Sequence, residues 1–187
     1  TMSRITVDID LNRVEGDLEF QVDLEDGVVV DARCVGTLYR GFEQIMIGRA
    51  PRDALVITPR VCGICGTAHL YAATLALEQI AHITPPAHAV QVRNLCLMAE
   101  TLQSDLRQSF LFFTPDFCNA NYAAHPLAAE LRDAFTPLKG SVVRGTLKAT
   151  RDVLGIVALF GGQWPHSTYM LPGGISQPAN SRRILDS

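Results

Sequence analysis

The chain has 187 residues, of which 48% are apolar, enough to fill a hydrophobic core. Its 16 basic and 19 acidic residues give a net charge of −3, so the chain lacks the basic surplus with which proteins bind nucleic acid. Five cysteines, an odd number, argue against a disulfide scaffold. The lack of a signal-peptide start and of an apolar run of about 18 residues predicts a cytoplasmic protein, which would reach a membrane only through partners.

The N-terminal part predicts a small antiparallel sheet. Apolar and polar residues alternate from Arg4 to Leu11, which is the period-2 pattern of a half-buried strand. Two further alternating runs, Leu18 to Leu24 and Val28 to Val35, flank Asp26-Gly27. An Asp-Gly pair between such runs favours a hairpin, because glycine accepts a positive φ.

After Pro59 the apolar spacing becomes helical. A first helix is predicted up to Pro85-Pro86, with apolar residues at Leu70, Ala73, Leu77 and Ile80. A long core helix follows over residues 87–113. Its apolar stripe consists of Leu95, Met98, Leu102, Leu106, Phe110 and Phe113.

Shorter helices are predicted near residues 127–135 and over residues 142–160. Residues 161–174 contain too many glycines and prolines for regular structure, and residues 180–185 have the pattern of a helix start. The expected fold class is therefore α+β, with a small antiparallel sheet followed by a bundle of long helices. Residues 1–58, the sheet and a connecting segment, and residues 59–187, the helical portion, are expected to be parts of one domain.

The strongest chemical signal is the pair Cys62 and Cys65, two residues apart at a predicted helix start. Two thiols at this spacing can point at one centre, and the helix dipole with its free N–H groups would favour their thiolate forms. Soft metals and redox disulfides both use such sulfurs. A thioredoxin-like site would follow a buried parallel strand, which is not apparent, and structural zinc or an iron–sulfur cluster would need four ligands. The structural alternative to a functional site is that Cys62 and Cys65 are two small buried residues in a glycine-rich turn.

Other candidate residues are weaker when each is taken alone. Glu15 and Glu43 each stand beside an arginine and a glycine, so backbone can approach a ligand while a carboxylate faces it. A solvated turn acid is the alternative for both. His69 lies one helical turn beyond Cys65, and His166 stands in an elaborate loop where a structural role is favoured. Cys34, Cys96 and Cys118 are expected to be packing residues.

Taken together, these segments resemble the large subunit of nickel–iron hydrogenases. The resemblance rests on segments in the family's order: Arg13-Val14-Glu15-Gly16, Arg40-Gly41-Phe42-Glu43, Pro51-Arg52-Asp53-Ala54, Arg60-x-Cys62-Gly63-x-Cys65-x-x-x-His69, Pro165-His166 and Pro172-Gly173-Gly174. The amino-acid sequence around Leu102 to Arg107 and Phe160 to Ser167 is most similar to that of the uptake and hydrogen-sensing branch. Asp17 departs from the histidine found in much of the family.

The resemblance implies roles for five residues. Cys62 matches a terminal nickel ligand, Cys65 the thiolate that bridges nickel and iron, and His69 a histidine donating toward the bridging sulfur. Glu15 matches the carboxylate that shuttles protons, and Glu43 a ligand of a magnesium site. The implied cofactors are a Ni–Fe centre with carbonyl and cyanide on iron, and magnesium, and the implied reaction is the reversible cleavage of dihydrogen.

The family's second cysteine pair is missing from this sequence, so the expected fold is incomplete relative to the family. The resemblance implies an N-terminal fragment, inactive alone, whose partners are the missing C-terminal part, an iron–sulfur small subunit and maturation proteins. Two alternatives stay open at this point. One is a non-catalytic maturation scaffold or hydrogen-sensor relative, and the other is an unrelated Cys-x-x-Cys metal-binding module.

Overall fold

The computed structural model describes residues 4–14, 16–177 and 185. The chain divides into two compact units, residues 1–41 and residues 42–187. The division expected at residues 58 and 59 stays a prediction. The predicted helix start at residues 180–185 lies outside the described residues except for Leu185.

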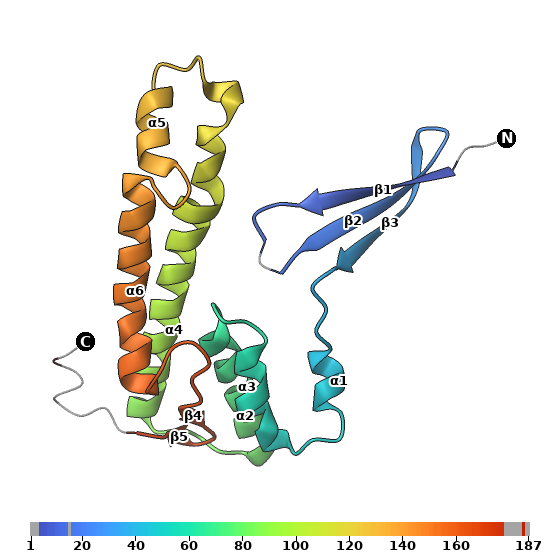
Figure 1. The fold of residues 1–187 in the computed structure, drawn as a ribbon. Coiled ribbons are helices and arrows are strands. Elements are labelled where there is room, and N and C mark those ends of the chain that lie inside the picture. The colour runs from blue at the N-terminus through green and yellow to red at the C-terminus, as the bar shows by residue number, and fades with distance from the viewer. Residues whose placement is uncertain (1–3, 15, 178–184, 186–187) are drawn as a thin grey trace. The chain divides into compact units, whose positions relative to one another are not determined.

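The first unit is the antiparallel sheet that the alternating pattern predicts (Figure 1). Its strands run in the order β1 (Arg4–Leu11), β2 (Leu18–Glu25) and β3 (Val28–Gly36). Asp26 and Gly27 adopt positive φ angles of 50° and 82° at the β2–β3 turn, as the hairpin signal requires. The expected sheet is confirmed.

A buried carboxylate organises one face of this sheet. Asp23 accepts hydrogen bonds from the Thr6 hydroxyl at 2.7 Å and from the Arg4 guanidinium at 2.9 Å. These two bonds lower the pKa of Asp23 below its ordinary value, and the charge of Arg33 acts in the same direction. Cys34, which we expected to pack in the interior, is exposed. Nearly all residues of β1 and β3 are exposed as well, so no described residue of the first unit covers the face of the sheet on which Cys34 lies.

The second unit is helical (Figure 1). Its helices are α1 (Phe42–Met46), α2 (Ala54–Ile57), α3 (Gly66–Ala81), α4 (Ala87–Arg107), α5 (Ala128–Phe135) and α6 (Ser141–Gly161). Helices α4 and α6 lie side by side, and α3 packs beside α4. Among the described residues, no helix combines the length and the apolar character needed to cross a membrane.

The long core helix differs from its prediction in length and in its buried face. Helix α4 ends at Arg107, and residues 108–113 form a π-helix. Met98 and Leu102 of the predicted stripe are 61% and 51% exposed. The buried residues of α4 are Ala89, Val92, Arg93, Cys96, Ala99, Glu100 and Gln103. The prediction is wrong because it assigned the interior to the apolar stripe, whereas the buried face carries other apolar residues together with three polar side chains that have partners, Arg93, Glu100 and Gln103.

One such partner set joins α4 to α3. The Arg93 guanidinium, with no exposed surface, donates to both oxygens of Glu78 at 3.2 and 2.9 Å. Burial alone would raise the pKa of Glu78, but hydrogen bonds from Arg93 and from the Gly173 N–H, together with the charge of Arg93, lower it below 4.5. The ion pair is therefore fully charged and hydrogen-bonded inside the unit.

The segment after α6 contains regular structure that the sequence did not predict. Strands β4 (Met170–Leu171) and β5 (Gly174–Ile175) form a short antiparallel hairpin. Arg93 donates to the carbonyls of Leu171 and Gly174, both at 2.7 Å. Composition alone pointed to a loop, because the anchor of this hairpin lies about 80 residues away in the chain.

We expect Arg93→Met to lower the free energy of unfolding by about 3–5 kcal/mol, because it removes the positive charge that pairs with the buried Glu78 carboxylate and the donor to two carbonyls. The folded-state pKa of Glu78 is depressed, so the contribution of the pair is present above the ordinary pKa of a glutamate and is lost as pH falls through the folded value. Urea titrations at pH 7 and at acid pH measure both effects.

The matched control is Arg151→Gln, which removes an exposed pair with Asp152. Its effect should stay within about 0.5 kcal/mol. Equal losses in the two variants would show that Arg93 contributes nothing beyond a surface pair.

Candidate functional site

The two cysteines converge in the turn that leads into α3. Cys65 is the residue preceding the helix, and the Cys62 sulfur accepts hydrogen bonds from the backbone N–H groups of Ile64 and Cys65, both at 3.3 Å. Both thiols are free and half-buried, and they lie near enough for Cys62 to raise the pKa of Cys65. The turn therefore presents two sulfurs at one place, at the helix start that the sequence indicates.

A buried carboxylate occupies the N-terminus of α3. Glu100 of α4, only 3% exposed, accepts hydrogen bonds from the backbone N–H groups of Thr67 and Ala68, each at 2.9 Å. These N–H groups are two of the donors that an α-helix leaves without an intrahelical partner. Glu100 thus joins α4 to the helix that begins directly after Cys65, and its negative charge takes the place that the helix dipole offers to an anion.

This arrangement reverses one expectation from the sequence. Burial raises the pKa of the Cys65 thiol to about 12, and the hydrogen bond and charge of Cys62 and the charge of Glu100 act in the same direction. In the metal-free chain Cys65 is therefore a thiol, and the expected stabilisation of its thiolate by the helix dipole is wrong. A metal ion at this site would have to displace the proton.

Two further side chains fix the backbone around the cysteines. Gln103 of α4 donates to the carbonyl of Ile64 at 3.3 Å, and the His166 ring lies 2.9 Å from the carbonyl oxygen of Pro59 through Nδ1. A Cβ atom on Gly66 would lie 2.9 Å from that same Pro59 oxygen, so only glycine fits there. The structural role favoured for His166 agrees with this contact.

Sequence reasoning missed Glu100 and Gln103. A signal was available: Arg93, Glu100 and Gln103 follow one another at intervals of seven and three residues, which places them on one face of a helix. The apolar stripe on which the prediction was based lies on the opposite face of the helix. The missing information was the set of backbone donors and acceptors on α3 that these side chains satisfy.

Of the other predicted site residues that the structure describes, His69 and Glu43 form no metal-binding group with the cysteines. His69 is half-buried in the first turn of α3, where its N–H donates to the Cys65 carbonyl at 3.3 Å. Glu43 is exposed on α1, and Glu15 lies outside the described residues. Within residues 4–14, 16–177 and 185, no group of three or more His, Cys, Asp or Glu side chains is placed to hold a metal ion. At the cysteine turn, the described residues therefore supply two sulfur donors, those of Cys62 and Cys65.

Comparison with protein families identifies the group to which these features belong. The model of the nickel-dependent hydrogenases matches residues 40–137, which include the cysteine turn and α4. The chain belongs to the nickel-dependent hydrogenase family. Its fold of a small antiparallel sheet followed by helices matches the corresponding part of solved hydrogenase large subunits.

Individual relatives agree with this assignment. The chain is 32% identical to the periplasmic [NiFeSe] hydrogenase large subunit of Desulfomicrobium baculatum, over 98% of this chain and 38% of the relative. It is 31% identical to the uptake hydrogenase large subunit of Rhodobacter capsulatus, over 90% of this chain and 30% of the relative. The reduced Ni-Fe-Se hydrogenase of Desulfovibrio vulgaris Hildenborough superposes with a TM-score of 0.78 at 35% identity, over 98% of this chain and 40% of that one. The chain thus spans about two fifths or less of these relatives.

We expect Glu100→Gln to lower the free energy of unfolding by about 1–3 kcal/mol, because the amide nitrogen of glutamine cannot accept a hydrogen bond and leaves one buried N–H of α3 unsatisfied. Urea titration followed by circular dichroism measures the change. Glu130→Gln, an exposed acid in the first turn of α5, is the control and should change stability by less than about 0.5 kcal/mol. If the two variants lose the same free energy of unfolding, Glu100 is not the anchor of α3.

Proposed function

We propose that this chain is the N-terminal part of a hydrogenase large subunit and supplies one of the two cysteine pairs of a Ni–Fe centre. The observation that carries the proposal is the convergence of Cys62 and Cys65 at the start of α3, inside the segment that matches the nickel-dependent hydrogenases. The other two thiolates would come from polypeptide beyond these 187 residues.

The donor chemistry fits such a centre. Thiolate sulfur is a soft ligand that suits nickel and low-spin iron, and the half-buried turn limits access of water. In this proposal the Cys62 sulfur would be a ligand of nickel, the Cys65 sulfur would be a ligand of both metals, and His69 would donate toward the Cys65 sulfur. The centre, with carbonyl and cyanide on iron, would supply the reversible heterolytic cleavage of dihydrogen.

The chain's own residues hold the two sulfurs and move the proton. Two backbone N–H groups point at the Cys62 sulfur, which stabilises negative charge on it. Glu100 and Gln103 fix the turn against α4, so the spacing of the sulfurs is set before any metal arrives. Glu15 would carry the proton away, and Glu43 would contribute a carboxylate to a magnesium site.

The proposed partners follow from the same reasoning. They are the C-terminal part of the large subunit, an iron–sulfur small subunit that takes the electrons, and maturation proteins that insert the metals. Assignment to the uptake and hydrogen-sensing branch is part of the proposal, and so is a cytoplasmic location. The names of the relatives include both uptake and periplasmic enzymes.

In a complete large subunit that contains this sequence, Cys65→Ser should abolish hydrogen-dependent dye reduction and remove nickel, because one of the metal ligands is lost. Elemental mass spectrometry and infrared bands of carbonyl and cyanide give the readout. Cys96→Ser is the matched control, since Cys96 is a buried core cysteine to which the proposal gives no metal. A complete subunit that binds zinc and no nickel would overturn the proposal and favour a non-catalytic relative.

The 187-residue chain alone should show no hydrogen-dependent dye reduction, because two thiolates cannot hold a centre that needs four. In the complete protein Glu15→Gln should leave nickel bound and slow isotope exchange between dihydrogen and water. Full exchange activity in that variant would refute the proton route. Turnover by the isolated chain would refute the requirement for a second cysteine pair.

A further inference from the structure

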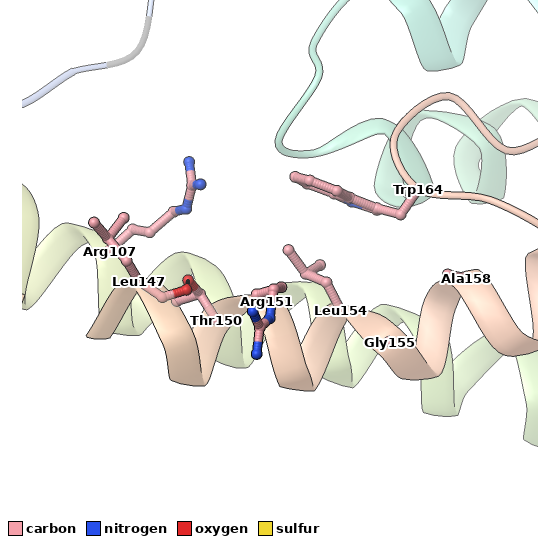
Figure 2. A pocket seen from close by; sticks show the side chains of 8 residues that line it. All are labelled: Arg107, Leu147, Thr150, Arg151, Leu154, Gly155, Ala158 and Trp164. Atoms are coloured by element: carbon pink, nitrogen blue, oxygen red, sulfur yellow. Dashed lines mark hydrogen bonds between the residues drawn. The ribbon is translucent and has the colours of Figure 1, made fainter. Parts of the chain in front are cut away.

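A groove on α6 contains donor groups that no residue of the described chain satisfies. It has a volume of about 280 Å³ and lies where the end of α4 and the loop after α6 meet the exposed side of α6 (Figure 2). Arg107 is the last residue of α4, and Trp164 stands in the loop. The groove is separate from the cysteine turn, whose residues do not line it.

Arg107 and Trp164 bring unpartnered N–H groups to this groove. The Nε of Arg107 and the Nε1 of Trp164 are both shielded from solvent and have no hydrogen-bond partner in the part of the chain that the structure describes. Figure 2 shows the Arg107 guanidinium, from α4, and the indole ring, from the loop, lying on the same side of α6. Shielded donors without an acceptor are unfavourable, so a ligand that supplies an acceptor would gain affinity here.

The chemistry of the groove selects an anion with an apolar body. Arginine and the indole N–H are donors only, and the planar guanidinium matches a carboxylate through two parallel hydrogen bonds. The floor is formed by Leu147, Leu154 and Ala158, together with the face of the indole ring. Arg151 also lines the groove, but its guanidinium points away from that of Arg107 in Figure 2 and pairs with Asp152.

The length of the groove favours a polypeptide over a small molecule. Leu147, Leu154 and Ala158 follow one stripe along α6, and at a rise of about 1.5 Å per residue this stripe is about 16 Å long. An extended chain covers that length with about five residues. The stripe would contact apolar side chains while Arg107 contacts an acidic one, so charge and apolar surface both match an acidic segment.

We propose that this groove binds a segment of a partner polypeptide in which an Asp or Glu stands beside large apolar residues. The carboxylate pairs with the Arg107 guanidinium, the Trp164 N–H offers a second donor in the same groove, and the apolar side chains lie along Leu147 and Leu154. The proposal goes beyond hydrogenase chemistry and does not depend on whether Cys62 and Cys65 bind metal.

Trp164 is the only tryptophan of the chain, so its fluorescence reports on the groove directly. The probe is a blocked hexapeptide with one Glu between two Leu residues, which is titrated into the 187-residue chain. The control is the same peptide with Gln in place of Glu. We expect a saturable shift of the emission with the Glu peptide and at least about tenfold weaker binding of the Gln peptide, because the charge-assisted hydrogen bonds are lost.

Protein variants test the same contact from the other side. Arg107→Gln should weaken binding of the Glu peptide at least about tenfold, and Arg107→Lys should weaken it less because the charge remains. The control is Arg132→Gln, which changes an exposed arginine of α5 outside the groove and should leave the affinity within about twofold. If Arg107→Gln does not fold, as judged by circular dichroism, the comparison of the two peptides on the unaltered chain decides.

Three outcomes would overturn the proposal. Equal affinity for the Glu and Gln peptides would remove the carboxylate from the contact. Acetate that shifts the emission at the same concentration as the Glu peptide would identify a site for small carboxylates. Self-association of the chain that Arg107→Gln abolishes, measured by sedimentation, would identify a second copy of this chain as the occupant.

Discussion

Burial of charged and amide side chains along one face of α4 is the constraint on which the helical unit depends. Arg93 anchors α3 and the β4–β5 hairpin, Glu100 caps the start of α3, and Gln103 holds the cysteine turn. Burying a polar group is costly unless it is hydrogen-bonded, so the bonds that these three residues make favour one position for each partner. The packing of three separate segments is fixed by this requirement.

The same face of α4 connects stability to the proposed chemistry. The cysteine turn has glycines at positions 63 and 66, and a turn of this kind is held by its neighbours more than by its own propensity. Glu100 supplies such support from behind Thr67 and Ala68, while the His166 ring contacts the carbonyl of Pro59 from the other side. Rigid support of two ligating residues is what a metal site with a defined geometry needs.

The cysteine turn and the α6 groove call for different partners. The turn carries two sulfurs and needs further thiolates, whereas the groove carries Arg107, Trp164 and an apolar stripe and needs an acidic segment. Within the described residues, the cysteine turn lacks further thiolates and the groove lacks an acceptor for its donors. A chain that spans about two fifths or less of its relatives would have such unsatisfied surfaces wherever the rest of a larger assembly packs against it.

The sequence by itself determined the sheet, most helix boundaries and the cysteine pair, because these depend on local patterns: alternation, helical spacing and the Asp26-Gly27 turn. Only the tertiary structure decided which face of α4 is buried, since the side chains of Arg93 and Glu100 find their partners across the fold. It also decided the protonation of Cys65, which follows from burial beside Cys62 and Glu100 and outweighs the local helix dipole. The spacing of Arg93, Glu100 and Gln103 places them on one helix face, but it does not identify their hydrogen-bond partners, which lie far away in the chain.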